Sequence, residues 1–300
     1  MVIVHLSGGF GNQLFSYAFG YAVAKARNDQ FYIDTAIQDA EWFFRNPDIL
    51  KMNITYDKRV TYPITRKFLD RAVFNKVWFR QSIGWKTKEL KEPDLQKLSD
   101  PIAYCKEIKG DIYLRGTWAN ESWFQSVSDE IRPLFTFKEE LSKEAKSIYD
   151  EISSCETSVT VHVRRGDYVK IGVAMEPDYY IRAMEEIAKR VKNPQFYCFS
   201  EDLQWAEEAF KEAPFSIHYP EYHSEDKGVE DFRLLSAGKH QIISNSTYSW
   251  WAAYLNGNQD RQIVIPCRED TIWNQETVVE GWISLPFTMN GKPEIETVQQ

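Results

Sequence analysis

The feature that most restricts how this chain can fold is residues 159–168, VTVHVRRGDY, where a strand pattern runs directly into charged side chains. Valine at every second position is the period of a half-buried β-strand, and Gly166 ends that period. In an open α/β sheet, ligands bind at the C-terminal edge of the strands. The strand delivers four polar residues to this edge: His162, Arg164, Arg165 and Asp167.

The two adjacent arginines indicate an anion site at that edge. A guanidinium is permanently charged and carries several N–H donors, so a pair of them needs an anionic partner. A diphosphate is the obvious candidate, because Arg meets phosphate oxygens in a bidentate fork. Two other interpretations are charges balanced by local carboxylates and an adhesion tripeptide, Arg165-Gly166-Asp167. An adhesion signal needs an exposed flexible loop, so the strand context favours a ligand site.

The composition is that of an ordinary globular protein. With 300 residues, 43% of them hydrophobic, the chain can form one large or two medium domains. The net charge of -8 argues against a general nucleic-acid-binding protein but permits a local basic site.

The cysteines indicate neither a metal centre nor a disulfide framework. Cys105, Cys155, Cys198 and Cys267 lie far apart and form no CxxC pair, and Cys198 is expected in the core. A reduced, cytoplasmic protein is the expectation. Because the chain opens on a strand pattern and has no long apolar run, we expect no signal peptide and no transmembrane segment. A peripheral membrane association stays compatible with this.

The N-terminal residues have the pattern of a nucleotide-binding-like α/β unit. An apolar strand (MVIVHL), a glycine turn, helical spacing and a second strand (FYID) follow one another. Gly9 and Gly11 match the first half of the dinucleotide fingerprint, but its third glycine position is Leu14. Asp34 stands near the distance expected of a ribose-binding acid. An NAD(P)-dependent oxidoreductase is therefore an alternative hypothesis.

Asn12 and Gln13 place two side-chain amides at the start of the first helix. Amides there can contact a hydroxyl group or an anion. Asn12 can equally serve as a simple helix cap, and both interpretations stay open.

The second half of the chain alternates strands and helices. We place a domain boundary near residue 137, which gives domains of residues 1–136 and 137–275 and a C-terminal tail of residues 276–300. Residues 38–110 are rich in aromatic side chains and either cover a sugar site or pack ordinarily. The expected strands are residues 195–200, 216–219, 240–245 and 261–266.

Two further strand ends carry polar residues, and parallel strands bring such ends to one edge. Hydroxyl and backbone N–H groups at the start of the helix after residue 245 favour a phosphate, although helix caps would look the same. Trp251, on one face of that helix, is expected in the core. The two sets are Ser200, Glu201 and Asp202, and Ser244, Asn245, Ser246 and Thr247.

The chain resembles the α-1,2-fucosyltransferases of glycosyltransferase family 11, especially the bacterial ones. The motifs occur in the family's order and span nearly the whole chain. The resemblance implies an α/β, GT-B-like fold of two Rossmann-like domains facing a central cleft, with GDP-fucose held by the C-terminal one. The motifs are GGFGNQLFSYAFGYAVA from Gly8, HVRRGDY from His162, FYCFSED from Phe196, EDFRLLSAGKH from Glu230 and NSTYSWWAAYL from Asn245.

The resemblance also implies roles for single residues. Arg164 matches the arginine that contacts the β-phosphate and the breaking bond, and Asp231 matches the position that reads guanine. Asn12 matches an asparagine near the reacting centre. The expected donor-binding residues are His162, Arg165, Ser200, Glu201, Asp231, Asn245, Ser246 and Thr247, and those expected on the acceptor side are Gly9, Gly11 and Gln13.

The catalytic base is left open. Some relatives have a Glu shortly after the Arg motif, where this chain has Gly172, so Asp167 and Glu176 are both candidates. Metal-dependent glycosyltransferases often carry an Asp-x-Asp sequence. None occurs in this chain, so we expect no metal and no cofactor. Arg164 would supply the charge that a metal supplies elsewhere. A carboxylate at Asp231 suits guanine, whose N1–H and 2-amino groups are adjacent donors.

The expected function is an inverting GDP-L-fucose: β-D-galactoside α-1,2-fucosyltransferase. Direct displacement by the acceptor 2-hydroxyl converts a β-linked donor into an α-linked product. The expected acceptor is a galactose-terminated oligosaccharide, with a lipid-linked bacterial glycan as one setting. A non-catalytic nucleotide-sugar-binding protein is the other alternative.

Overall fold

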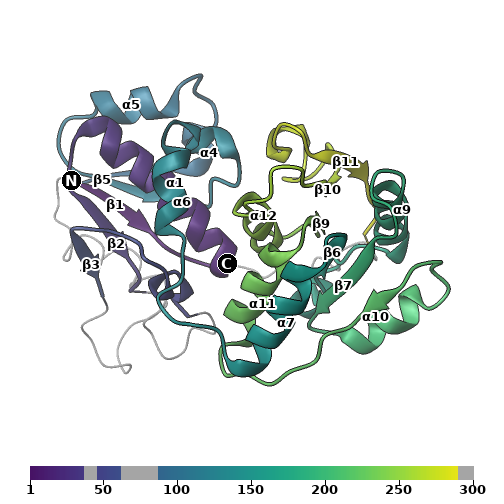
Figure 1. Ribbon diagram of the computed structural model, residues 1–300. Helices are drawn as coiled ribbons and strands as arrows, with labels where there is room; N and C mark the ends of the chain where they lie inside the picture. The colour runs from purple at the N-terminus through teal and green to yellow at the C-terminus, as the bar shows by residue number, and fades with distance from the viewer. Residues whose placement is uncertain (37–45, 62–86, 290–300) are drawn as a thin grey trace. The chain divides into compact units, whose positions relative to one another are not determined.

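The computed structural model describes residues 1–36, 46–61 and 87–289, so residues 38–45 and 62–86 of the aromatic-rich segment 38–110 lie outside this part. The chain divides into two compact units, Met1–Glu139 and Glu140–Gln300, and both are built from parallel strands and helices (Figure 1). The predicted boundary near residue 137 falls close to this division. The mixed α/β class expected from the sequence is confirmed.

The first unit contains a parallel sheet with the strand order β3-β2-β1-β5-β4 in its described part. Helix α1 (Phe10–Arg27) packs against β1 and β2. A Cβ atom on Gly20 would lie 2.8 Å from Val4 Cβ, so only glycine allows this close approach. The strands are β1 (Val2–His5), β2 (Phe31–Asp34), β3 (Lys58–Val60), β4 (Lys88–Lys91) and β5 (Ile112–Arg115). The other elements are η1 (Asp48–Lys51), α4 (Glu92–Leu95), α5 (Pro101–Glu107), η3 (Glu121–Trp123), η4 (Gln125–Val127) and α6 (Ser128–Leu134).

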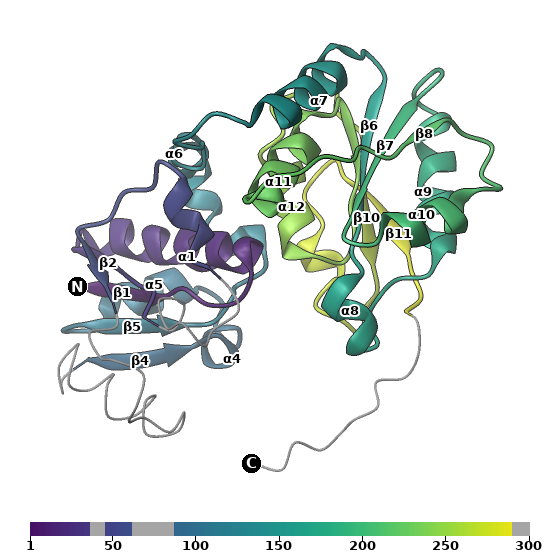
Figure 2. The same cartoon turned by 90° about the horizontal axis from the view of Figure 1, so that it is seen from below.

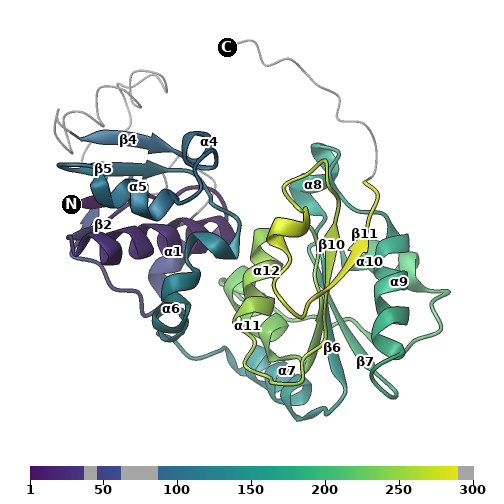
Figure 3. The same ribbon diagram turned by 90° about the horizontal axis from the view of Figure 1, so that it is seen from above.

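The second unit is a parallel sheet of order β11-β10-β9-β6-β7-β8, again in the described part of the chain. Read from β8, this is the order of a doubly wound Rossmann sheet. Helices cover both faces, with α7, α11 and α12 on one and α9 and α10 on the other (Figures 2 and 3). The strands are β6 (Ser158–Val163), β7 (Gln195–Ser200), β8 (Ile217–His218), β9 (His240–Ile242), β10 (Ile263–Cys267) and β11 (Ile283–Pro286). The helices are α7 (Lys143–Ser154), α8 (Gly166–Lys170), α9 (Pro177–Ala188), α10 (Leu203–Phe210), α11 (Lys227–Ala237) and α12 (Thr247–Tyr254), with η5 at Gln275–Thr277.

Two expectations from the sequence need correction. Residues 276–300 are not wholly a tail, because β11 pairs in register with β10 and completes the sheet. Its short, mixed sequence ISLP has no clear period, so the strand was not predicted. Strand β6 is buried on both faces rather than half-buried, because helices cover the sheet on both sides. Its polar side chains find partners, as when the Thr160 hydroxyl donates to the Leu235 carbonyl at 2.7 Å. Trp251 and Cys198 are fully buried, as expected.

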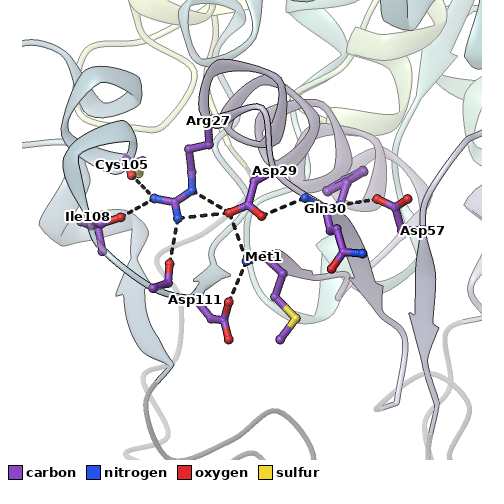
Figure 4. A network of polar contacts seen from close by, with 10 residues as sticks. Met1, Arg27, Asp29, Gln30, Asp57, Cys105, Ile108 and Asp111 are labelled. Atoms are coloured by element: carbon purple, nitrogen blue, oxygen red, sulfur yellow. Dashed lines mark hydrogen bonds and ion pairs between the residues drawn. The ribbon is translucent and has the colours of Figure 1, made fainter.

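Arg27 fastens the C-terminal end of α1 to the loops beside it (Figure 4). Its guanidinium donates to three backbone carbonyls at 2.7 Å each, those of Cys105, Ile108 and Gly110. It also pairs with Asp29 at 3.2 Å, and only 8% of its side chain is exposed. A buried cation with these partners holds the turn after α1 to the segment before β5.

We expect Arg27→Met to lower the free energy of unfolding by about 3 kcal/mol, because it leaves several buried acceptors unpaired. Chemical denaturation measures this. Arg190→Met is the matched control, since Arg190 is 41% exposed and pairs with Glu186 on the surface. A loss of about 0–1 kcal/mol is expected there. Equal losses in the two variants would contradict the role given to Arg27.

Candidate active site

The three strand ends singled out in the sequence lie side by side. Strand β6 pairs with β7 on one side and β9 on the other, both parallel, with Val163 opposite Ser200 and Val161 opposite Ile242. The residues that follow each strand therefore meet at one edge of the sheet. Between β6 and β9 the strand order reverses, and ligands of doubly wound sheets bind at this switch point.

Arg164 is held by two carboxylates at this edge. Its Nη2 donates to Asp167 Oδ1 at 2.6 Å, and its Nη1 forms an ion pair with Glu201 Oε1. Only 19% of the Arg164 side chain is exposed, so the pairs are partly desolvated. The alternative in which local carboxylates balance the arginine charges is therefore observed for Arg164. A guanidinium has more N–H groups than two such contacts use, so a phosphate can still be accommodated.

Arg165 is fixed by different partners. Its guanidinium stacks on the Trp205 ring at 3.8 Å, and its Nε lies 3.4 Å from Asp202 Oδ2. Its backbone N–H donates to Glu201 Oε2 at 3.1 Å. One carboxylate, that of Glu201, therefore contacts both arginines and sets the turn between them.

Other polar residues at these strand ends also have local partners. Ser200 Oγ accepts the Asp202 backbone N–H at 3.1 Å. Asp202 Oδ1 accepts the Trp205 N–H at 3.2 Å and caps α10. Asn245 donates from Nδ2 to the Val173 carbonyl at 2.9 Å, which anchors the loop after α8.

Helix α12 begins at the switch point without a side-chain cap. Ser246 is its N-cap residue, yet no hydroxyl hydrogen bond caps the helix. The alternative in which Ser246 serves only as a cap is therefore not what the structure shows. The backbone N–H groups and the helix dipole at this end favour an anion, as the sequence predicted.

His162 lies behind the arginines, 5% exposed, with Nδ1 2.9 Å from Ser244 Oγ. Burial, aided by the charge of Arg164, lowers the pKa of His162 to about 3. The imidazole is therefore neutral at physiological pH and acts as a hydrogen-bonding residue. Its ring also packs against Tyr248, whose hydroxyl donates to the Gly228 carbonyl at 2.5 Å.

A buried neutral histidine makes stability depend on pH. In the unfolded chain His162 takes up a proton near pH 6.5, whereas in the folded chain it does so only near pH 3. Stability is therefore lost as pH falls below 6.5. Between pH 7 and pH 5 we expect the wild type to lose about 2 kcal/mol more than His162→Asn does in urea denaturation. The exposed His223, changed to Asn, is the control. Parallel wild-type and His162→Asn curves would show that His162 is not held neutral.

The candidate bases lie just beyond β6. Asp167 is in α8, which Figure 2 shows at the end of the sheet, and its carboxylate pairs with Arg164. Glu176 directly precedes α9, and its backbone N–H donates to the Thr288 carbonyl at 3.0 Å.

Asp231, on α11, is the remaining donor-side candidate. Tyr222 donates to its Oδ1 at 2.8 Å, and Lys227 lies 3.5 Å from the same oxygen. Burial raises the pKa of Asp231, while Lys227 and the phenol oppose that rise. Tyr222 was not predicted from the sequence, because an isolated tyrosine in a loop gives no pattern.

The glycine turn before α1 is built around Gly8. Its φ is +71°, and a Cβ atom at this position would lie 2.7 Å from Asn12 Nδ2, so both observations favour glycine. Asn12 therefore folds back over the turn, within the first turn of a helix whose N-cap is Gly9, so it is not the cap. Gly11 follows in the same turn and is buried.

Gln13 has a positioning role in this turn. It is fully buried, and its Nε2 donates to the carbonyls of Gly8 and Asn46 at 3.1 and 2.8 Å. Its Oε1 accepts the Ile49 N–H at 3.2 Å. Both ends of the amide therefore bind backbone groups, and the side chain fixes the loop rather than presenting an amide at the surface.

The sequence did not predict that the loop after β5, residues 116–118, contacts helix α1 close to the glycine turn. Ser16 Oγ contacts both the Asn12 and Gly116 carbonyls, at 2.9 and 2.8 Å. Glu92 accepts the N–H groups of Thr117 and Trp118 at 2.7 and 2.9 Å. This clamp holds Trp118 at a φ of +53°, a conformation that costs a bulky residue energy. Only the sheet brings Glu92 and this loop together.

Asp34 does not serve as a ribose-binding acid. It is 1% exposed, accepts the Tyr113 hydroxyl at 2.6 Å and accepts the Ala36 N–H at 2.9 Å. Its carboxylate is thus engaged inside the first unit. The oxidoreductase hypothesis rested on Gly9, Gly11 and Asp34, and it loses its acidic residue here.

Within residues 1–36, 46–61 and 87–289, no group of three or more His, Cys, Asp or Glu side chains could hold a metal ion. Among the helices described there, none is long and apolar enough to cross a membrane.

The chain has two consecutive parallel α/β units, and the second carries paired arginines at the switch point of a Rossmann sheet; this is the architecture of a GT-B-type glycosyltransferase. The sequence profile described as "Glycosyl transferase family 11" matches residues 1–285. The chain belongs to this family, and it is a glycosyltransferase of the α-1,2-fucosyltransferase type.

Curated relatives agree with this assignment. The chain is 31% identical over 279 residues to an alpha-1,2-colitosyltransferase of Escherichia coli, covering 88% of this chain and 90% of that protein. It is 29% identical to the O-antigen biosynthesis glycosyltransferase WbnK of Escherichia coli, covering 93% and 99%. It is 26% identical to galactoside alpha-(1,2)-fucosyltransferase 1 of Sus scrofa, covering 85% of this chain and 65% of that one.

Among solved structures, the chain is similar to NodZ alpha-1,6-fucosyltransferase soaked with GDP-fucose. The TM-score is 0.50 at 15% identity, covering 85% of this chain and 91% of that chain. A likeness at this identity shows the fold, which is of the GT-B type.

Proposed function

We propose that the protein is an inverting α-1,2-fucosyltransferase that moves L-fucose from GDP-β-L-fucose to the 2-hydroxyl of a β-galactoside. The observation that carries this is the placement of Arg164 and Arg165 at the switch point of a Rossmann sheet, beside the uncapped start of α12. The relatives' names support the α-1,2 linkage and the galactoside.

The donor is proposed to lie along the edge formed by β6, β9 and α12. Arg164 and Arg165 face the diphosphate, and the N–H groups at Ser246 and Thr247 add fixed dipoles. Breaking the sugar–phosphate bond leaves negative charge on the departing oxygen, which these donors stabilise without reorganising. Neutral His162 holds the strand end in place, and Asp231 accepts the guanine N1–H and 2-amino groups.

The acceptor is proposed to bind at the glycine turn of the first unit, with Gly9, Gly11 and Asn12 nearest to it. Gln13 supports this turn through its backbone contacts. Asp167 and Glu176 remain the candidates for the base that takes the proton of the attacking 2-hydroxyl. If Asp167 is the base, it must exchange its contact with Arg164 for the acceptor.

The proposed reaction is tested by incubating the protein with GDP-fucose and a panel of galactosides, with and without EDTA, and reading the products by mass and linkage. We expect an α-1,2-fucosylated galactoside in equal yield under both conditions, since the arginines supply the charge. Binding of GDP-fucose without turnover on any acceptor would favour the non-catalytic alternative. Activity lost with EDTA and restored by a divalent ion would overturn the metal-independent mechanism.

A colitosyl donor is a second candidate, favoured by the similarity to the alpha-1,2-colitosyltransferase. Colitose is L-fucose without its 3-hydroxyl group. A site that hydrogen-bonds this hydroxyl rejects the sugar that lacks it, whereas an apolar site discriminates weakly. The same assay with both sugar nucleotides distinguishes the two by their kcat/KM values.

Arg164→Lys is expected to lower kcat by about 10²–10³-fold with a smaller change in KM for GDP-fucose. Lysine keeps the charge but cannot reproduce the planar fork of donors. Arg182→Lys, on the exposed side of α9, is the matched control and should keep wild-type kinetics. A folded Arg164→Lys protein with near-normal kcat and a lowered Tm would make Arg164 a structural ion-pair residue.

A further inference from the structure

Asp231 presents its two carboxylate oxygens unequally. In the described part of the chain, Oδ1 receives the Tyr222 hydroxyl at 2.8 Å and lies 3.5 Å from Lys227 Nζ. Only 18% of the Asp231 side chain is exposed. The protein therefore fixes the carboxylate through Oδ1. Because Lys227 is too distant for a strong hydrogen bond, Oδ1 can accept one further donor beside Oδ2.

Tyr222 is held firmly enough to orient its partner. It is 8% exposed, in the loop between β8 and α11, and Lys227 Nζ lies 3.8 Å from the centre of its ring. The next residue, His223, donates its backbone N–H to Glu144 Oε2 of α7 at 3.1 Å. The phenol, the ammonium group and the carboxylate thus contact one another on one side of Oδ1.

We propose that Tyr222 is a positioning residue that gives the Asp231 site its preference for guanine. The inference rests on the proposed function, in which Asp231 receives the base of GDP. By fixing Oδ1, Tyr222 orients the carboxylate plane so that it can accept the adjacent N1–H and 2-amino donors together. A carboxylate free to turn would accept them less well, because two parallel hydrogen bonds need one defined plane.

Tyr222 also favours the ionised form of Asp231. Burial raises the pKa of this carboxyl, and the groups that face it are Tyr222, Lys227 and Glu230. Glu230 raises the pKa further, whereas the phenol and the ammonium group lower it. Without the phenol, Asp231 would take up a proton at a higher pH and could no longer accept both guanine donors.

The test is the affinity for GDP and for inosine 5′-diphosphate, which lacks the 2-amino group, measured by calorimetry on the full chain. The variants are Tyr222→Phe, which keeps the ring and removes only the hydroxyl, Asp231→Asn and the double variant. Tyr197→Phe is the matched control, because Tyr197 is a buried tyrosine of β7, 4% exposed, that faces Glu151.

For Tyr222→Phe we expect GDP to bind about tenfold more weakly, with a reduced preference over inosine diphosphate. The loss of GDP binding at low pH should begin at a higher pH than in the wild type. In the Asp231→Asn background, removing the Tyr222 hydroxyl should add little, because its effect passes through the carboxylate. Tyr197→Phe should leave the GDP preference unchanged.

Equal weakening of both nucleotides by Tyr222→Phe, or the same loss in the Asp231→Asn background, would overturn the inference and leave Tyr222 a structural residue. If Tyr222→Phe does not fold, the pH profile and GDP preference of Lys227→Met test the same contact set, and unchanged values would overturn it as well. A wild-type protein that binds neither nucleotide would instead refute the proposed donor.

Discussion

The ion pairs of Arg164 with Glu201 and Asp167 are the interaction on which the site depends. Two neighbouring guanidiniums repel each other and lose hydration at a sheet edge, so the turn that carries them needs fixed carboxylates. Glu201, directly after β7, supplies one and also accepts the Arg165 backbone N–H. The parallel register of β6 and β7 is what brings this carboxylate level with the arginines.

Behind the arginines, buried contacts connect the strand end to the helices around it. His162 joins β6 to Ser244, and its ring rests on Tyr248, whose hydroxyl reaches Gly228 at the start of α11. The same helix carries Asp231. A change at His162 is therefore expected to affect the donor edge through packing, while its neutral imidazole adds no charge to the diphosphate site.

The local charge of the proposed site differs from the charge of the whole chain. A net charge of -8 leaves the protein acidic, and carboxylates also balance the two arginines. What this edge offers a diphosphate is a set of fixed N–H donors, from the guanidiniums and the start of α12. Fixed guanidiniums and helix N–H groups can stabilise a departing diphosphate directly. In the first unit, the Trp118 backbone has a strained conformation. Hydrogen bonds from Ser16 and to Glu92 hold the loop that contains it next to the start of α1.

The sequence by itself determined the two parallel α/β units, because strand and helix periods, Gly166 and the motif order are local signals. It also placed His162, Arg164 and Ser246 at strand ends, which parallel pairing then brought together. Only the tertiary structure decided that the Gln13 amide and the Asp34 carboxylate form hydrogen bonds inside the first unit. It also revealed Tyr222, Glu92 and strand β11, whose partners lie 9, 25 and 19 residues away in the chain, beyond the reach of a helix or strand period. Side-chain partners across such separations leave no period in a single sequence, so only the folded chain shows them.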